Sequence, residues 1–595
     1  MNTRSIWIWL SLGCVLGGLV LLHKHFGKPP PPAPRKVLPL LQAEKVDTVQ
    51  IRPRGQVEIR AERTKDGWQL VEPISYRAQS VVLDTLLQEL QKLEAAAFIP
   101  EPELKPGRDA ADDFGLKTPA ASIVLHQGNY RTQVLIGART APGDQFFLQV
   151  VGVEGINVVD AELLNLLPAS CHDLRDTAFV ELAEQACNRI SVTNGGRFFE
   201  LERTGPNKRW RMVRPIDARA DNERITDLLQ RLNTVRVRQF VSDDPDADLG
   251  AFGLQPAELE LVFRQGTNVV AHLKFGAGAT NRPGEVYACR AGQHSIVSVS
   301  KDPLALWGGS VNDFRDPRLM SLDGEVRKLE IQAGETFSVE QQTNGAWRVL
   351  PDGYPADAVA VRDLLVALSS LKIAEFTQDV VPPIVLPNYG LAPPSRKYIL
   401  SAPGPQQTNE VLVELEFGTN VNDRVYARRA GEGSVYAVNW NEVQRLPVTP
   451  VEMRDRRIWD VSEDDLAGVT IQQQGKTRQL LRKARHEWSL APGSQGIINE
   501  LAIEESVRPL CRLTAAAWVA RGAEKKGEYG FSEQGYHLTL DLKSGEKLAL
   551  ELGRQAGGDT AYAAVNLQRE TWIFVMPPAT YRFLATYLVI PGAVF

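Results

Sequence analysis

The sequence has little of what marks catalytic, metal-binding or nucleic-acid-binding chemistry. Its 595 residues include eight histidines and five cysteines, and neither type clusters. No CxxC pair occurs, and P-loop, dinucleotide, serine-hydrolase and zinc-protease motifs are also missing. The net charge of −5 argues against a nucleic-acid-binding protein, because such proteins usually carry a basic stripe. We therefore expect no catalytic, cofactor-binding or metal-ligating residue, and a protein that is not an enzyme.

The cysteines are too scattered to define a disulfide framework. Cys171 and Cys187 lie near each other in the sequence. They could pair in an oxidising compartment, or they could remain two free thiols. The cysteine pattern does not decide the compartment.

One acidic stretch, 244–250, alternates carboxylates as a calcium loop does. An EF-hand loop needs glycine at its sixth position and glutamate at its twelfth. Counted from Asp244, these positions hold Leu249 and Gln255. We interpret the stretch as a solvated loop.

What the sequence does contain is self-similarity. A tryptophan-bearing segment recurs four times, each time followed by a leucine-rich stretch, an aromatic residue and an aromatic-glycine tripeptide. The tripeptide glycines are separated by 253 − 115 = 138, 390 − 253 = 137 and 530 − 390 = 140 residues. A fixed period is the signature of a repeat protein. We expect these residues to form the structural core of each repeat: Trp68, Trp210, Trp347, Trp488, Gly115, Gly253, Gly390 and Gly530.

The period predicts four domains, in line with a prior of about 150 residues per domain. Runs that alternate apolar and polar residues indicate half-buried strands. Leucines spaced three and four apart, clearest in 81–93, indicate a helix with one apolar face. We predict an α+β fold of four tandem repeats of about 138 residues, each a mainly antiparallel twisted sheet with two helices. The predicted boundaries are 47–184, 185–323, 324–463 and 464–595, the last being a divergent terminal repeat.

The N-terminus predicts a transmembrane helix in front of these repeats. After a tail of residues 1–4, residues 5–22 form an uncharged apolar run. At 1.5 Å per residue this run covers about 27 Å, close to the hydrocarbon core of a bilayer of about 30 Å. A cleaved signal peptide is the alternative, but no small-x-small cleavage site follows the run. The prolines of the linker 23–46 favour a stiff, extended spacer.

Two features of the sequence point to opposite membrane sides for the repeats. Positive charge after the apolar run favours a cytoplasmic domain under the positive-inside rule, yet large domains translocate despite flanking charge. We expect a single-pass protein of the inner membrane with a large extracytoplasmic C-terminal domain.

An Arg-Asp dipeptide closes each of the first three repeats and is missing from the fourth. The dipeptide is therefore present only where another repeat follows. We infer that it ties one repeat to the next, through a salt bridge or a capped helix end. The predicted junction residues are Arg175, Asp176, Arg315, Asp316, Arg454 and Asp455.

Taken together, the tryptophan strand, the leucine-rich helix, the aromatic-glycine turn and the terminal Arg-Asp resemble the bacterial domain of unknown function 4340. The resemblance covers residues 47–595 as four copies, of which the fourth departs most. Members of this family are typically membrane-tethered and are often encoded beside an ABC-type transporter permease and its auxiliary subunit, as in gliding-motility-type clusters. The resemblance implies an accessory role in such a complex and carries over no catalytic residue.

Three functions follow as hypotheses. The first is a non-enzymatic, membrane-anchored scaffold or accessory subunit of an ABC-type transporter or a gliding-motility-type envelope complex. Its partner would be a membrane protein such as the permease or its auxiliary subunit. The second is a periplasmic module that binds a glycan or peptide through Trp307, Trp440 and Trp459. The third, more remote, is a hydrolase with an unrecognised site.

Overall fold

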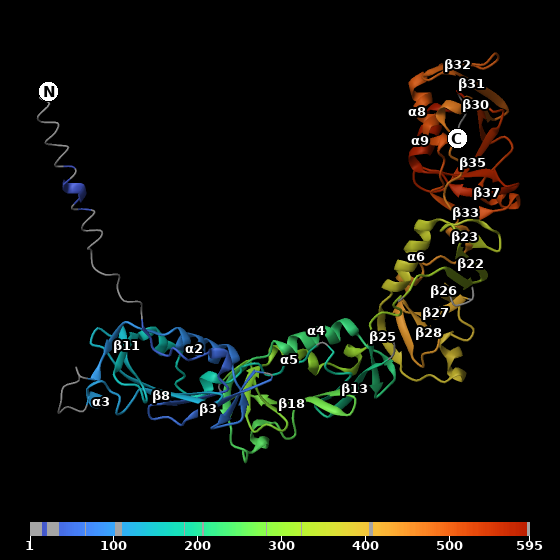
Figure 1. Cartoon of the computed structure of the whole chain (residues 1–595). Coiled ribbons are helices and arrows are strands. Elements are labelled where there is room, and N and C mark those ends of the chain that lie inside the picture. The colour runs from blue at the N-terminus through green and yellow to red at the C-terminus, as the bar shows by residue number, and fades with distance from the viewer. Residues whose placement is uncertain are drawn as a thin grey trace, which may run out of the picture. The chain divides into compact units, whose positions relative to one another are not determined.

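The computed structural model describes residues 13, 15–18, 20, 35–65, 67–101, 110–183, 185–204, 208–280, 282–322, 324–403 and 409–591. The chain divides into two units, Met1–Asp217 with Asn222–Asp313, and Ala218–Asp221 with Phe314–Phe595. Figure 1 colours the chain by residue number. Within the described residues, four large antiparallel sheets follow one another along the sequence, and we number the repeats by these sheets.

The first unit holds the elements of repeats 1 and 2. In repeat 1 the strands are β1 (Arg35–Lys36), β2 (Thr48–Pro53), β3 (Ile59–Thr64), β4 (Gly67–Glu72), β5 (Tyr76–Arg77), β6 (Glu94–Ala95), β7 (Ala97–Ile99), β8 (Ala121–Gln127), β9 (Tyr130–Arg139), β10 (Gln145–Val150) and β11 (Ile156–Asp160). Its helices are η1 (Ala43–Lys45), α2 (Ser80–Lys92), α3 (Ala110–Asp113), η3 (Ala161–Leu166) and η4 (Cys171–Leu174). In repeat 2 the strands are β12 (Arg189–Asn194), β13 (Arg197–Thr204), β14 (Arg209–Arg214), β16 (Val237–Ser242), β17 (Leu259–Gln265), β18 (Asn268–Gly278), β19 (Glu285–Arg290) and β20 (Ile296–Ser300). Its helices are α4 (Asn222–Asn233), η5 (Leu249–Phe252), α5 (Asp302–Ala305), η6 (Leu306–Gly308) and η7 (Val311–Phe314).

The second unit holds β15 (Ala218–Arg219) and repeats 3 and 4. In repeat 3 the strands are β21 (Lys328–Ala333), β22 (Glu335–Gln341), β23 (Trp347–Leu350), β24 (Tyr354–Pro355), β25 (Ile373–Gln378), β26 (Arg396–Pro403), β27 (Asn409–Val421), β28 (Arg424–Arg429) and β29 (Val435–Asn439). Its helices are α6 (Ala358–Ser370), η8 (Pro383–Tyr389), α7 (Trp440–Val443) and η10 (Pro450–Met453). In repeat 4 the strands are β30 (Leu466–Gln473), β31 (Lys476–Ala484), β32 (Glu487–Leu490), β33 (Ala517–Arg521), β34 (Tyr536–Leu542), β35 (Lys547–Gln555), β36 (Ala561–Leu567) and β37 (Glu570–Val575). Its helices are η11 (Glu463–Asp465), α8 (Glu500–Cys511), η12 (Ala523–Tyr529) and α9 (Pro578–Tyr587).

The sheets share one strand order. The first runs β5-β4-β3-β2-β8-β9-β10-β11-β7, and the third runs β24-β23-β22-β21-β26-β27-β28-β29-β25. The second has the same order from β14 to β16. The fourth, β32-β31-β30-β34-β35-β36-β37-β33, lacks a counterpart of β5. In every sheet the strand that follows the long helix (β7, β16, β25 or β33) therefore lies at the edge.

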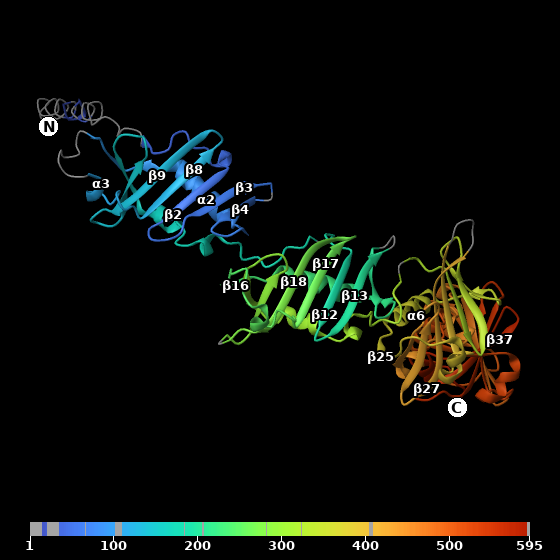
Figure 2. The same cartoon turned by 90° about the horizontal axis from the view of Figure 1, so that it is seen from below.

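The long helix covers one face of its own sheet. Strands β2, β8 and β9 lie side by side in Figure 2, with α2 against them. Leu83, Leu86, Leu87 and Leu90 of α2 are buried and join a core that also contains Trp68. Each fully buried side chain of this size contributes about 1.5–3 kcal/mol. The three- and four-residue spacing of the leucines therefore places the helix on the sheet.

Two glycines of each repeat interlock. The tripeptide glycine has a positive φ, for example +66° at Gly253 and Gly390, a conformation that residues with a Cβ rarely adopt. The carbonyl before it lies directly on the glycine that ends a central strand. A Cβ added at Gly276 would collide with the carbonyl oxygen of Phe252, and one at Gly418 with that of Tyr389. The second glycine is therefore required by close backbone approach.

We predict that Gly418→Ala lowers the free energy of unfolding by about 1–3 kcal/mol, because overpacking forces backbone shifts. Gly433→Ala is the control, since its Cβ would meet no atom closer than 3.7 Å. Urea denaturation of both variants measures the difference. Equal midpoints for the two variants would contradict the interlock.

Strands dominate the repeats. The chain is mostly antiparallel sheet, with 44% strand against 23% helix, and one long helix packs on each sheet of repeats 1–3. The second helix is short there, as η3, α5 or α7, and reaches ten residues in α9. Proline and glycine explain this, because Pro168, Gly309 and Pro447 follow those short helices and favour helix ends.

The predicted transmembrane helix is the part of the predicted fold that is wrong. Among the described residues, no helix is long and apolar enough to cross a membrane. Of the stretch 5–22, residues 13, 15–18 and 20 are described. The rest of that stretch, the tail 1–4 and residues 23–34 of the linker lie outside the described residues.

Candidate interaction site at the repeat junctions

The first junction is built around a buried arginine. Arg175 is 0% exposed, and its Cζ lies 4.2 Å from the ring centre of Tyr76 and 3.6 Å from that of Phe240. Its Nη1 and Nη2 donate to the two carboxylate oxygens of Asp243 at 2.9 and 2.8 Å. Nη2 also donates to Ser295 Oγ at 2.7 Å. Since Tyr76 belongs to repeat 1 and the other partners to repeat 2, one guanidinium holds both repeats.

We call this receiving group the arginine seat: an aromatic ring on the edge strand and a carboxylate three residues later. Bidentate pairing with a carboxylate is the strongest form of charged hydrogen bond. Stacking on aromatic rings adds about 2 kcal/mol when the cation is desolvated. The seat therefore recognises both the charge and the planar shape of a guanidinium.

Asp176, the aspartate of the dipeptide, makes different contacts from Arg175. Asp176 accepts a hydrogen bond from the backbone N–H of Ala178 at 2.9 Å and pairs with Arg77 at 3.2 Å. Beyond it the chain pairs with repeat 2: Phe179 N–H donates to Val235 O at 3.0 Å, and Val237 N–H donates to Thr177 O at 2.7 Å. Asp176 therefore shapes the turn that leads the chain into the next repeat.

The second junction lies within the second unit and repeats this arrangement. Arg315 is 2% exposed, stacks 3.9 Å from the ring centre of Phe376 and donates to Asp379 at 2.6 Å. Asp316 pairs with Arg219 at 2.5 Å, and Arg219 also pairs with Glu432 at 2.8 Å. Burial works to lower the pKa of Arg219, but the two carboxylates outweigh it and raise that pKa.

The third junction keeps the arginine and replaces its polar partners. Arg521 follows Trp518 by three residues, where Asp243 and Asp379 follow their aromatics. Trp572 pairs with Arg521 across the two strands. It takes the position that Ser295 and Ser434 have just before the matching strands β20 and β29. Arg521 pairs elsewhere, with Asp352 at 2.7 Å and Glu570 at 2.6 Å.

Arg454 is consequently held by aromatic rings alone. It is 7% exposed, and its Cζ lies 3.6 Å from the ring centre of Trp572 and about 5 Å from those of Trp518 and Tyr354 (4.9 and 5.1 Å). Burial lowers the pKa of Arg454 to about 10. No described carboxylate hydrogen-bonds to it. The third junction therefore buries a cation without a hydrogen-bonded carboxylate among the described residues, and Glu570 and Asp455 attract it only at longer range.

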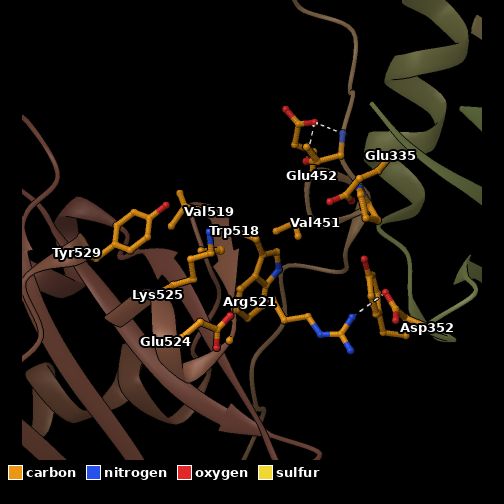
Figure 3. A pocket seen from close by; sticks show the side chains of 15 residues that line it. Glu335, Asp352, Val451, Glu452, Trp518, Val519, Arg521, Glu524, Lys525 and Tyr529 are labelled. Atoms are coloured by element: carbon orange, nitrogen blue, oxygen red, sulfur yellow. Dashed lines mark hydrogen bonds and ion pairs between the residues drawn. The ribbon is translucent and has the colours of Figure 1, made fainter. Parts of the chain in front are cut away.

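A groove of about 720 Å³ lies beside the third junction. Figure 3 shows Glu335, Val451 and Glu452 facing Trp518 and Lys525 across it, with the Arg521–Asp352 ion pair at one edge. Oε2 of Glu452 accepts from Val448 N–H and Thr449 N–H at 2.8 and 2.9 Å and from the Thr449 hydroxyl at 3.0 Å. This oxygen and hydroxyl therefore form a capping box of η10, and the groove also offers aromatic and charged groups.

The predicted core residues lie inside the repeats. Trp68, Trp210 and Trp488 are at most 3% exposed, and Trp347 is half-buried. Trp68 Nε1 donates to Asp84 at 3.0 Å, and Trp488 Nε1 donates to Glu504 at 2.7 Å. The four tripeptide glycines all have positive φ: Gly115, Gly253, Gly390 and Gly530.

The remaining candidates do not form a site. Trp307 is fully buried against Phe263, and Trp459 donates to Leu510 O at 2.6 Å. Trp440 stacks under Arg396 at 5.2 Å. None of the three tryptophans lines the 720 Å³ groove.

Thiols and carboxylates are equally dispersed. Cys171 and Cys187 are free thiols, and burial raises the pKa of each. The carboxylates of Asp244 and Asp248 accept backbone N–H groups in their own loop, each at 2.9 Å. In the part of the chain that the structure describes, no three His, Cys, Asp or Glu side chains gather as metal ligands do.

The arginines of the junctions were singled out from the sequence, but their seats were not. Asp243 and Asp379 directly follow β16 and β25, and Ser295 directly precedes β20; the fourth copy has no counterpart of them. The signal that could have revealed them is positional. A carboxylate stands three residues after the aromatic in repeats 1–3 and changes to Arg521 in repeat 4.

The first junction should weaken in acid. Partial burial works to raise the pKa of Asp243, but hydrogen bonds from Arg175 and Ser295 outweigh it and lower that pKa. A carboxylate with a lowered folded pKa stabilises above its unfolded pKa of about 3.9, and this stability is lost as the pH falls through the folded pKa. We expect urea midpoints to fall between pH 5.5 and 2.5. In Asp243→Asn the urea midpoint should fall less over this pH range. An equal fall in the variant would contradict the role of Asp243 in the acid sensitivity.

The model of the family described as "Domain of unknown function (DUF4340)" matches the chain three times, over residues 68–209, 210–379 and 347–534. The chain belongs to this family. It carries the DUF4340 domain in tandem copies, as the resemblance predicted. Each match begins on one of the repeated tryptophans, Trp68, Trp210 or Trp347. No protein of curated function matches the chain.

Proposed function

We propose that the chain is a non-enzymatic scaffold or accessory subunit of a membrane complex in the bacterial envelope. An ABC-type transporter or a gliding-motility-type complex is the proposed setting, and the permease or its auxiliary subunit is the proposed partner. The repeats would stand on the extracytoplasmic side of the inner membrane. Membership of the DUF4340 family supports this setting by association.

The observation that carries the proposal is the buried arginine between consecutive repeats. A guanidinium that stacks on rings and binds a carboxylate of the next repeat resists bending at the junction. Repeat proteins present extended surfaces built from such coupled units. Within each unit, repeats coupled in this way are suited to present neighbouring surfaces to a partner protein.

Photo-crosslinking in native membranes tests the proposal. A photoreactive residue would replace Val81 on α2, Val366 on α6 or Leu501 on α8, which are 78, 59 and 66% exposed. The control position is Lys547, whose side chain is 72% exposed on β35. We expect at least one helix position, and not the control, to crosslink a transporter permease or its auxiliary subunit. Crosslinks to envelope polymer alone would overturn the proposal.

A second function, binding of a glycan or peptide, is favoured by the groove beside the third junction. Trp518, Tyr529 and several carboxylates line it, a lining that suits a polar ligand with an apolar face. Tyr529→Ala should then abolish retention of the chain on immobilised peptidoglycan fragments. Equal retention of both forms would remove this candidate.

A further inference from the structure

The first repeat carries an arginine seat that none of the three dipeptide arginines fills. Phe98 lies on the edge strand β7 and pairs with Asn157 of β11. Phe240 pairs in the same way with Val297, and Phe376 pairs with Tyr436. Glu101 follows Phe98 by three residues, as Asp243 follows Phe240. The ring and the carboxylate of a seat are therefore both present in repeat 1.

The segment 35–37, in front of repeat 1, makes the same backbone contacts as the segment 177–179 between repeats 1 and 2. Val37 N–H donates to Leu93 O at 2.9 Å, as Phe179 N–H donates to Val235 O at 3.0 Å. A short antiparallel pairing joins Lys36 to Glu94, where an isolated bridge joins Ala178 to Arg236. Val37 thus takes the structural position of Phe179.

Arg35 partly fills the seat from a different position. Its Cζ lies 3.9 Å from the ring centre of Phe98, close to the 3.6 Å of Arg175 on Phe240. Because Val37 matches Phe179, Arg35 matches Thr177 and stands two residues beyond the position of a junction arginine. Within the described residues, no hydrogen bond or ion pair joins Arg35 to Glu101, and the exposed Glu101 has no cationic partner.

We propose that the seat formed by Phe98 and Glu101 is a docking site for an arginine in an extended segment of a partner protein, with Arg35 as its resident placeholder. The three internal junctions identify the chemistry, because each buries an arginine against the same strand and two of them bind it through the carboxylate. The dipeptide arginines of this chain, Arg175, Arg315 and Arg454, are buried at their own junctions, so the proposal places the arginine on a partner protein. The inference deepens the proposed function by naming what the partner presents, and it rests on that function for the identity of the partner.

A peptide copied from the first junction tests the site directly. The probe is residues 172–176, His-Asp-Leu-Arg-Asp, which ends before the positions that Arg35, Lys36 and Val37 occupy; it is blocked at both ends and labelled for fluorescence anisotropy with the purified full-length chain. Arg35→Ala should tighten binding at least fivefold, because it removes the internal competitor. Glu101→Lys should weaken binding at least tenfold, and a probe with Gln in place of its Arg should not bind. Glu162→Lys, an exposed charge reversal on η3 of the same repeat, is the matched control and should bind as the parent chain does.

Three results would overturn the inference: no binding to the Arg35→Ala variant, equal loss in Glu101→Lys and Glu162→Lys, or equal binding of the Gln probe. Circular dichroism of each variant excludes loss of folding as the cause. The peptide assay contains no transporter component. If the peptide binds as expected but photo-crosslinking captures no permease or auxiliary subunit, the seat stands and the proposed function fails. If photo-crosslinking captures a permease or auxiliary subunit but the peptide does not bind, the proposed function stands and the docking site is rejected.

Discussion

Arg175→Met is expected to lower the free energy of unfolding of the unit that contains repeats 1 and 2 by about 3–5 kcal/mol. Methionine fills much of the space between Tyr76 and Phe240, so the loss is mainly electrostatic. Asp243 and Ser295 lose the guanidinium that they share, and a carboxylate in a half-buried site is left unpaired. Breaking one partner of a buried pair is costly for this reason.

Urea denaturation, followed by tryptophan fluorescence, measures the effect. Arg238→Met is the control, since Arg238 is an exposed residue of the same edge strand, β16; exposed substitutions usually stay within about 0.5 kcal/mol. Limited proteolysis should also cleave the variant between residues 176 and 188, where the chain passes from repeat 1 to repeat 2. A variant that unfolds like the control would show that the junction does not depend on its arginine.

Arg454→Met is expected to act in the opposite direction, from no change to a gain of about 4 kcal/mol in the free energy of unfolding. The cation at this junction has no hydrogen-bonded carboxylate among the described residues, and burial lowers its pKa to about 10. Methionine removes that buried charge, keeps contacts with Trp518 and Trp572 through a polarisable sulfur, and leaves no unpaired anion behind. The loss of cation–π attraction offsets part of the gain.

Thermal and urea unfolding of the Arg454→Met variant test this contrast beside Arg175→Met. Arg175 and Arg454 occupy equivalent positions and receive the same substitution. A difference between the two variants in the free energy of unfolding therefore comes from the surroundings of each arginine. Destabilisation of the Arg454 variant by more than 2 kcal/mol (about thirtyfold in the equilibrium constant) would contradict the account.

The periodic features of the sequence predicted the repeats because each has a local physical cause. The leucines of α2 lie on one face, the tripeptide glycines have positive φ, and the tryptophans pack in or against the cores. The second helix stays short in repeats 1 and 3 because Pro168 and Pro447 follow it and proline favours a helix end.

The seats of the arginines were not predictable in the same way. Asp243 meets Arg175 across a sequence separation of 68 residues, and no local pattern marks either residue as the partner of the other. Only the fold, which places the edge strand of one repeat beside the end of the previous one, reveals the pair. The exchange of aspartate for Arg521 at the third junction is visible only after that alignment.

A double-mutant cycle between Arg175 and Asp243 tests the central claim, that buried arginines couple successive repeats. The cycle compares Arg175→Met, Asp243→Leu and the double variant by urea denaturation. The account predicts a coupling free energy of at least about 2 kcal/mol, within the range of about 0.5–3 kcal/mol found for residues in contact. A coupling below about 0.5 kcal/mol, as for independent sites, would mean that the repeats are joined by other contacts and that the arginine is not what couples them.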